Sequence, residues 1–229
     1  MGRRALRRID PSLDLTPYLK TIDQLPRPWD HERLFSQPGP LEVEVGSGKG
    51  LFLRTASGDY PQRNFLGIEV SRKYARFAAA ALAKRNRSNA IMLVGDALEV
   101  FSDWIADDAL AAVHVYFPDP WWKKRHKKRR VMQPSFIHDI QRTLLPGGRL
   151  HFWTDVEEYF ETTLALLAAE TDLEGPLDVP ETAAEHDMDY RTHFERRTRL
   201  HRETVYRAEF RKRDPSSSRV PARGHEATA

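Results

Sequence analysis

The sequence predicts a single α/β domain built around a doubly wound, mostly parallel sheet. Two observations predict this fold. Apolar strand-like stretches alternate with amphipathic helical stretches from residue 41 onward, and a length of 229 residues suits one domain of this class. Strands that alternate with helices pair in parallel, and ligands then bind at the carboxyl ends of the strands. We therefore expect the functional residues where strands end.

Six short apolar stretches are expected to form strands, at residues 41–45, 64–70, 90–95, 110–117, 149–154 and 204–213. Helices are expected between them, after Gly50, over 72–85, around 99–104, over 134–145 and over 156–170. The helix from residue 134 has a proline in its first turn, where proline is tolerated, and the Pro-Gly-Gly stretch after it ends it.

The two ends of the chain are expected to lie outside this domain. Residues 1–38 contain five prolines, a density that excludes a long helix and predicts an arm lying over the domain of residues 39–213. Residues 214–229 are rich in Ser, Pro, Arg and Gly, and are predicted to be disordered.

Composition excludes several kinds of chemistry. The chain has no cysteine, which removes disulfides, thiol nucleophiles and cysteine-ligated zinc. Its histidines lack the regular spacing of metal ligands, so we predict no metal. No stretch approaches the roughly 20 apolar residues of a membrane span, and the N-terminus lacks a signal-peptide pattern. These features predict a cytoplasmic protein without a membrane partner, whose oligomeric state stays open.

A glycine-rich turn follows the first predicted strand. In the stretch EVEVGSGKG, Gly46, Gly48 and Gly50 lie where the strand would pass into a helix, which allows a close approach of the backbone to a ligand. Such turns also serve simple chain reversal. Glu69 ends the next strand 23 residues after Gly46, near the offset at which an acid meets ribose hydroxyls, and this favours a nucleotide-like ligand.

The spacing G-x-G-x-G differs from the dinucleotide pattern G-x-G-x-x-G, which disfavours an NAD-dependent enzyme. Together with Glu44, two residues before the first glycine, it resembles the S-adenosylmethionine site of the class I methyltransferases, which have a Rossmann-like, seven-stranded sheet. The resemblance implies that Glu44 and Glu69 face the cationic amino acid end and the ribose of this cofactor. Asp96 matches the place of an adenine contact, but an N-cap of the following helix explains it equally well.

The stretch VYFPDPWWKKRHKKRR, residues 115–130, joins an acid, two tryptophans and a run of cations at the end of the fourth predicted strand. Pro118 and Pro120 restrict the backbone on both sides of Asp119, and would hold its carboxylate at the edge of the ligand cleft. An exposed turn would explain an aspartate alone. The tryptophans and cations that follow favour a functional role.

Seven of the eight residues from Lys123 to Arg130 are Lys or Arg. A run of cations often serves as a solubilising loop, but such mutual repulsion is tolerated most readily where a polyanion binds. If these cations contact phosphates, the affinity for the nucleic acid should fall steeply as the salt concentration rises. The two tryptophans could stack on an extruded base or belong to the core. The predicted RNA-backbone patch consists of Lys124, Arg125, Lys127, Lys128, Arg129 and Arg130.

Six stretches resemble, in this order, the bacterial type of the tRNA (guanine-N7-)-methyltransferase family: EVGSGKG, GIE, FPDPWWKKRHKKRR, FWTD, THFE and VYRAEF. The resemblance implies S-adenosylmethionine-dependent methylation of a guanine in the tRNA variable loop at N7, which gives 7-methylguanosine. It implies cofactor contacts by Glu44, Gly46, Gly48, Gly50, Glu69, Asp96 and Asp119, of which Asp119 is also the catalytic acid. It implies substrate contacts by Lys123, Asp155, Thr192, Phe194 and Glu195. Trp122 and His193 replace the family's usual proline and lysine.

The chemistry of the target fits these residues. Guanine N7 has a lone pair and no proton, so a fixed carboxylate can stabilise the migrating charge and no base is needed. Asp155 and Glu195 could accept hydrogen bonds from the guanine N1–H and amino group, which would discriminate against adenine.

Two other functions stay open. A methyltransferase for exocyclic amines usually has Pro-Pro before the aromatic residue, which this chain lacks. A non-catalytic RNA-binding protein with this fold would fail to bind S-adenosylmethionine, although the glycine turn and both cleft acids are intact.

Overall fold

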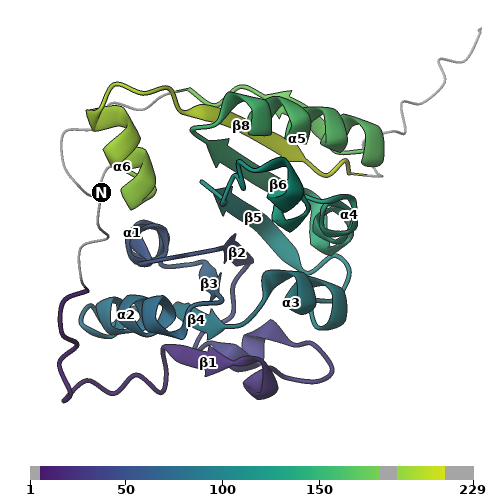
Figure 1. Cartoon of the computed structure of the whole chain (residues 1–229). Helices are drawn as coiled ribbons and strands as arrows, with labels where there is room; N and C mark the ends of the chain where they lie inside the picture. Colours follow the sequence, from purple (N-terminus) through teal and green to yellow (C-terminus); the bar gives the residue numbers. More distant parts are fainter. Residues whose placement is uncertain (1–5, 181–189, 215–229) are drawn as a thin grey trace, which may run out of the picture.

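One eight-stranded sheet with helices on both faces organises the computed structural model, which describes residues 6–180 and 190–214 (Figure 1). The strand order is β1-β4-β3-β2-β5-β6-β8-β7. The predicted α/β class with a mostly parallel sheet is confirmed. The predicted disordered tail lies outside the described residues except for Asp214.

The strands are β1 (Leu19–Thr21), β2 (Leu41–Val45), β3 (Asn64–Glu69), β4 (Ala90–Val94), β5 (Leu110–Tyr116), β6 (Leu144–Thr154), β7 (Glu174–Leu177) and β8 (Tyr206–Arg211). The α-helices are α1 (Leu51–Asp59), α2 (Arg72–Ala83), α3 (Ala97–Asp103), α4 (Pro134–Thr143), α5 (Glu157–Glu170) and α6 (His193–Leu200). The described residues also form the 3-10 helices η1 (Ile22–Gln24), η2 (His31–Leu34) and η3 (Lys124–Arg129).

Strands β1 to β6 pair in parallel, and β8 pairs antiparallel with both β6 and β7. The eighth strand beyond the expected seven is β1, which the proline-rich N-terminal segment adds beside β4. From the same segment, Leu25 and Phe35 are buried in the core. Strand β6 begins earlier than predicted and includes the Pro-Gly-Gly stretch.

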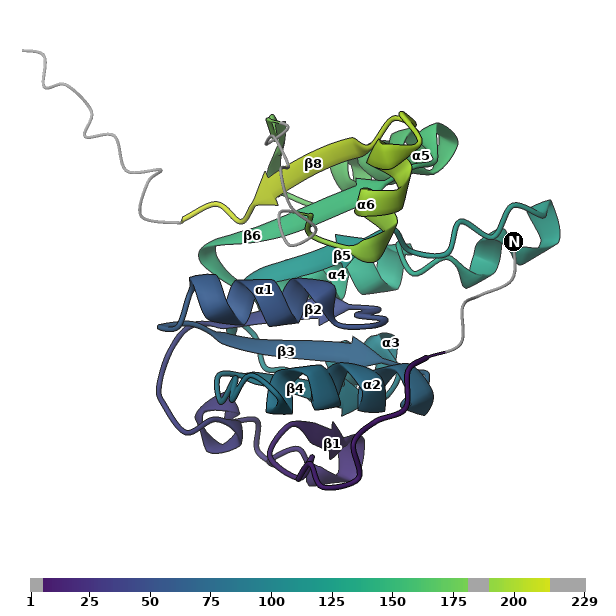
Figure 2. The ribbon, with the colours of Figure 1, turned by 90° about the vertical axis from the view of Figure 1, so that its left-hand side faces the viewer.

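The two faces of the sheet are covered by different helices. Helices α3, α4 and α5 contribute buried residues to one core cluster, which includes the side chains of Val43 and Val113. Helices α1 and α2 form a second cluster, which contains Phe52 and Tyr116 (Figure 2). Burial on both faces explains why the central strands have nearly continuous apolar sequences. No helix in the part of the chain that the structure describes is both long and apolar enough for a membrane span.

Candidate active site

The carboxyl ends of five neighbouring parallel strands meet at one edge of the sheet. Their registers align Val94 with Glu69, Val45 with both Ile68 and Val115, and Tyr116 with Trp153. The glycine turn, Asp96, Asp119 and Asp155 follow these positions, and Glu44 and Glu69 lie at the carboxyl ends of β2 and β3. The fold therefore brings Glu44, Glu69, Asp96, Asp119 and Asp155 to this edge.

The glycine turn after β2 has a backbone that other residues rarely adopt. Gly46, Gly48 and Gly50 have φ angles of 75°, 54° and 69°. A Cβ atom at Gly46 would meet nothing within 4 Å, so the left-handed backbone selects glycine there and leaves open space beside it. A Cβ atom at Gly50 would lie 2.6 Å from the Cβ of Ala78, so close packing on α2 adds a second reason.

Glu69 fixes this turn from the end of β3. Its Oε2 accepts a hydrogen bond of 2.8 Å from the Gly48 N–H, and its Oε1 accepts one of 2.8 Å from the Ser71 N–H. Each carboxylate oxygen has a further lone pair, so ribose hydroxyls could still donate to it. The predicted ribose acid is thus held by the turn that would carry the cofactor.

Glu44 is a buried carboxyl group beside the same turn. It is 3 % exposed, and among the described residues its Oε2 has no hydrogen-bond partner. Burial raises the pKa of Glu44 to about 8. An unsatisfied buried acid costs free energy, and a cationic ammonium group would satisfy it. The turn and this acid therefore fit the amino acid end of S-adenosylmethionine.

Asp96 has the capping role that the sequence left open. It is the N-cap of α3, and its Oδ1 accepts a hydrogen bond of 2.9 Å from the Leu98 N–H. Its side chain is exposed at the edge of the sheet. The predicted adenine contact stays a prediction.

The loop after β5 has a constrained backbone around Asp119. Phe117 and Trp121 both have left-handed φ angles, 49° and 46°, on either side of the Pro-Asp-Pro stretch. Such a conformation costs about 1 kcal/mol or more for residues other than glycine, and it concentrates at functional sites. The loop is therefore held in one shape that leaves Asp119 exposed.

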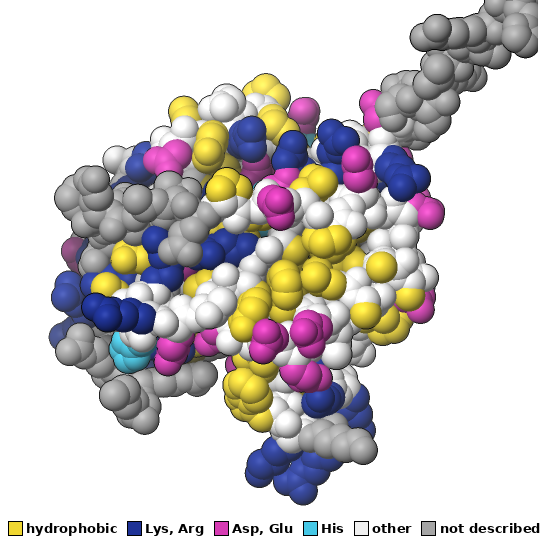
Figure 3. Space-filling model, turned by 90° about the horizontal axis from the view of Figure 1, so that it is seen from above, with side chains coloured by type: hydrophobic (Ala, Val, Ile, Leu, Met, Phe, Trp, Pro, Cys, Tyr) yellow, Lys and Arg dark blue, Asp and Glu magenta, His cyan; other side chains and the backbone are white. Residues whose placement is uncertain are grey.

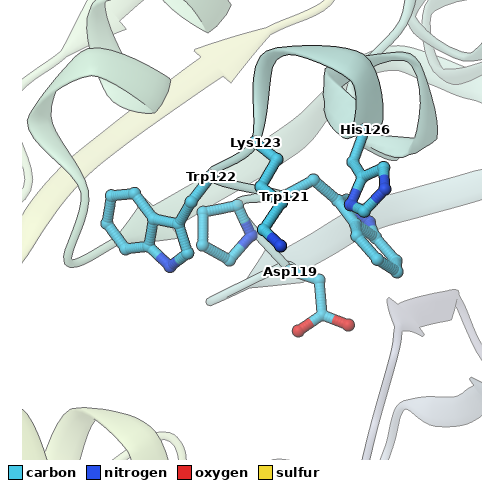
Figure 4. Close-up of a pocket in the computed structure, with 6 residues that line it drawn as sticks. Asp119, Trp121, Trp122, Lys123 and His126 are labelled. Carbon is cyan, nitrogen blue, oxygen red and sulfur yellow. The ribbon is translucent and has the colours of Figure 1, made fainter.

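Asp119 borders a hollow of about 320 Å³ lined by Pro120, Trp121, Trp122, Lys123 and His126. Figure 4 shows its carboxylate pointing away from the two indole rings, on the side to which the Lys123 side chain extends. The acid, the two tryptophans and Lys123 thus border one hollow.

The cations of residues 123–130 divide into two groups. Arg130 is 7 % exposed, and it pairs with Glu158 at 2.6 Å while its Nε donates to the Pro120 carbonyl oxygen at 2.8 Å. The inclusion of Arg130 in the RNA-backbone patch was therefore wrong, because its guanidinium is buried and holds the loop. Lys127 also pairs with Glu158, at 2.6 Å, and these two cations lower the pKa of that carboxyl group to about 2.

Arg125, Lys128 and Arg129 are exposed on η3, and the side chain of Lys124 lies outside the described part of the structure. Figure 3 shows Lys and Arg side chains gathered on a projection at the lower edge of the view, and Figure 2 shows the η3 segment extending beyond the strand ends. Lys123 and His126 border the same hollow as Asp119, and contact of the exposed cations with RNA stays a prediction.

Helix α6 brings the predicted substrate residues to the same edge. Thr192 is its N-cap and accepts a hydrogen bond of 3.0 Å from the Glu195 N–H. Phe194 is 49 % exposed, and its ring stacks on that of Phe117 with centroids 6.2 Å apart. Helix α6 was not predicted, although the stretch Thr-His-Phe-Glu has the spacing of a capping box.

Glu195 is buried at the start of α6 in this structure. It is 3 % exposed, and its Oε2 accepts a 2.6 Å hydrogen bond from the Arg191 N–H. Its Oε1 accepts bonds from Arg199 and Arg207, at 3.3 and 3.4 Å. Both carboxylate oxygens of Glu195 thus accept hydrogen bonds within the protein, and its predicted contact with guanine stays a prediction. Asp155, after β6, is exposed and accessible.

Two residues of this site were missed by sequence reasoning. Glu158 anchors the loop through Arg130, and Phe117 supports Phe194. No local pattern marks the first, because its partner lies 28 residues away. Among the described residues, no group of three His, Asp or Glu side chains is placed to hold a metal.

Comparison with known proteins gives the same assignment. Residues 38–208 match the model of a family described as "Putative methyltransferase". A tRNA (guanine-N(7)-)-methyltransferase of Rhodopirellula baltica is 53 % identical over 93 % of this chain and 81 % of its own length. One of Cupriavidus necator is 38 % identical, over 92 % and 78 % of the two chains.

Two solved structures share the fold. The 16S rRNA methyltransferase KamB has a TM-score of 0.59 at 17 % identity, with 80 % of this chain and 93 % of that chain covered. The aminoglycoside resistance methyltransferase NpmB1 has a TM-score of 0.53 at 18 % identity, with 82 % and 94 % covered.

Proposed function

The chain belongs to the tRNA (guanine-N(7)-)-methyltransferase family, and on this premise we propose that it methylates N7 of a guanine in tRNA with S-adenosylmethionine, giving 7-methylguanosine. The single observation that carries the proposal is the placement of Asp119. Its carboxylate is exposed on a constrained loop that follows β5, next to the strand that leads into the glycine turn, and it borders a hollow with Lys123 and His126. A further part of the proposal is that the guanine lies in the variable loop of the tRNA.

The cofactor would lie along the glycine turn. The backbone of Gly46, Gly48 and Gly50 leaves room for close approach, Glu69 would accept from the ribose, and Glu44 would face the amino acid end. Asp96 would contact the adenine from its exposed position. When bound, S-adenosylmethionine supplies a methyl group on a positively charged sulfur.

Asp119 would act through its charge alone. Guanine N7 is an acceptor on the major-groove edge with no proton to remove. Positive charge moves from the donor to the purine during transfer, and a fixed carboxylate stabilises that charge without moving a proton. The rigid backbone from Phe117 to Trp121 would keep the carboxylate aligned, so little reorganisation accompanies the reaction.

Recognition of guanine would rest on Asp155 and the start of α6. The exposed carboxylate of Asp155 would accept from the guanine N1–H and amino group, a pattern that adenine lacks. Thr192 and Phe194 would contact the base from the helix that Glu195 holds in place. Lys123 would lie near a phosphate or the base carbonyl. Absence of a metal and a cytoplasmic location stay predictions.

The test is methyl transfer to an unmodified tRNA transcript with identification of the product nucleoside. 7-Methylguanosine is the expected product, and a transcript without the variable-loop guanine should accept no methyl group. An N6- or N2-methyl product would instead assign the protein to exocyclic amines. Failure to bind S-adenosylmethionine would make it a non-catalytic RNA-binding protein.

A further inference from the structure

Trp122 is the most exposed large hydrophobic side chain among the described residues, with 71 % of its surface accessible. Tryptophan is a residue that folded proteins usually bury to a large extent. Trp121, its neighbour, is partly buried. The His126 ring lies edge-on to it at 5.9 Å, and the Arg129 guanidinium lies over it at 5.2 Å.

The backbone that presents Trp122 is fixed on both sides. Before it, the Pro120 carbonyl oxygen accepts the hydrogen bond from Arg130. After it, η3 starts with a hydrogen bond of 2.7 Å from the His126 N–H to the Lys123 carbonyl oxygen. Figure 4 shows the Trp122 and Trp121 rings on opposite sides of the Lys123 side chain. An exposed indole on a rigid support loses little conformational entropy when a planar group stacks on it.

The charge around Trp122 indicates what that planar group is. Lys123 follows it directly, and Arg125 and Lys128 are exposed on η3. An aromatic face beside several cations is the arrangement that binds unpaired nucleotides, because the base stacks and the phosphates meet the cations. An acidic peptide would use the cations but would have no planar group for the indole.

The position of Trp122 separates it from the target guanine. Asp119 and Trp122 border the same hollow, but the carboxylate points away from the Trp122 indole, so a base stacked on that indole is a neighbour of the base beside the carboxylate (Figure 4). Three residues of chain span at most about 10 Å. A base on Trp122 therefore belongs to a nucleotide close to the target.

We propose that the indole of Trp122 stacks on an unpaired nucleobase adjacent to the methylated guanine, forming a second base site on the loop. This inference rests on the proposed function, because it takes tRNA as the substrate. The second site positions the RNA strand, and the exposed cations beside it contact the flanking phosphates.

The first test compares Trp122→Ala, Trp122→Phe and the wild type for methylation of unmodified tRNA. Loss of a base stack should raise KM and the tRNA Kd about tenfold for Trp122→Ala, while kcat changes less than about threefold. Phenylalanine keeps an aromatic face and should restore KM to within about threefold. The control is Tyr60→Ala, which removes an exposed aromatic residue from the far end of α1 and should change nothing.

The second test places an abasic nucleotide on either side of the target guanine. At one of the two positions, the abasic substitution should weaken wild-type binding about tenfold yet leave Trp122→Ala unaffected, because the partner of the stack is already missing. The salt slope of binding should be the same for Trp122→Ala and wild type, since no charge is removed.

The outcomes separate the two proposals. A wild type that forms no 7-methylguanosine refutes the proposed function. If the wild type forms 7-methylguanosine, either of two results overturns the second base site. In one, Trp122→Ala keeps the wild-type KM. In the other, Trp122→Ala responds to both abasic substrates as the wild type does. If Trp122→Ala lost binding to tRNA and to polyglutamate equally, the second base site would also be overturned. That result would mean that the surface binds acidic polymers in general.

Discussion

The Nε of Arg130 donates a hydrogen bond of 2.8 Å to the carbonyl oxygen of Pro120, and this bond closes the loop that carries Asp119. The same guanidinium pairs with Glu158 on α5 and lies 4.3 Å from the centre of the Tyr159 ring. One buried cation of the basic run thus ties the proposed catalytic loop to the helix after β6.

Replacing Arg130 by Ala should therefore reduce both stability and turnover. The Pro120 bond, the ion pair and the ring contact are lost together, and we expect a cost of about 2 kcal/mol in the free energy of unfolding. Urea unfolding measures this cost. Lys127→Ala is the matched control, because its pair with Glu158 is exposed and should contribute at most about 0.5 kcal/mol. Equal effects of the two substitutions would contradict the anchoring role.

Asp119→Ala should abolish methyl transfer while tRNA binding stays within about threefold of wild type. Removing a preorganised electrostatic group typically costs about 100-fold or more in kcat. Single-turnover methylation and filter binding measure the two quantities. Asp119→Asn keeps the shape without the charge and should be equally inactive, whereas wild-type turnover in either variant would remove Asp119 from the mechanism.

The exposed cations of η3 should set the salt dependence of tRNA binding. The double variant Arg125→Ala, Lys128→Ala should reduce the slope of log Kd against log salt by about 1 to 2 units, because each phosphate contact contributes somewhat under one unit. The matched control is Lys84→Ala, Arg213→Ala, two exposed cations at the opposite edge of the sheet. An unchanged slope in the η3 variant would mean that these residues are a solvated surface.

Binding of S-adenosylmethionine should strengthen as pH rises from 6 to 7.5. Burial raises the pKa of Glu44 to about 8, so the carboxyl group is mostly protonated below that pH, whereas a cationic ligand requires the ionised form. The affinity should rise about tenfold per pH unit. Calorimetry at several pH values measures it, and Glu44→Gln should bind weakly with no such dependence.

The raised pKa of Glu44 also predicts that the free energy of unfolding of the ligand-free protein decreases as pH rises, whereas binding of S-adenosylmethionine strengthens. The folded state holds a proton on Glu44 between its ordinary pKa and about 8, so this contribution to stability falls as pH rises through that window. Glu44→Gln should remove this decline. A decline of equal size in the variant would assign it to another group.

Strands β2 to β6 and helices α1 to α5 could be predicted from sequence, because each has its own apolar periodicity or cap. Strand β1 could not, since Leu19–Thr21 has only three residues and extends only because β4 offers it an open edge. Strand β7 contains Gly175 and Pro176, which locally favour a turn, and pairing with β8 overrides that preference.

The sequence by itself determined the glycine turn, the acids at the strand ends and the stretch from Phe117 to Arg130, because these depend on residue type and spacing along the chain. Only the tertiary structure decided that Arg130 is buried, that both carboxylate oxygens of Glu195 accept hydrogen bonds within the protein, and that Trp122 rather than Trp121 is exposed. Each of these depends on a partner brought close by packing, such as Glu158 or Arg207. Residues of the same type in a charged or aromatic run therefore acquire different roles once the chain folds.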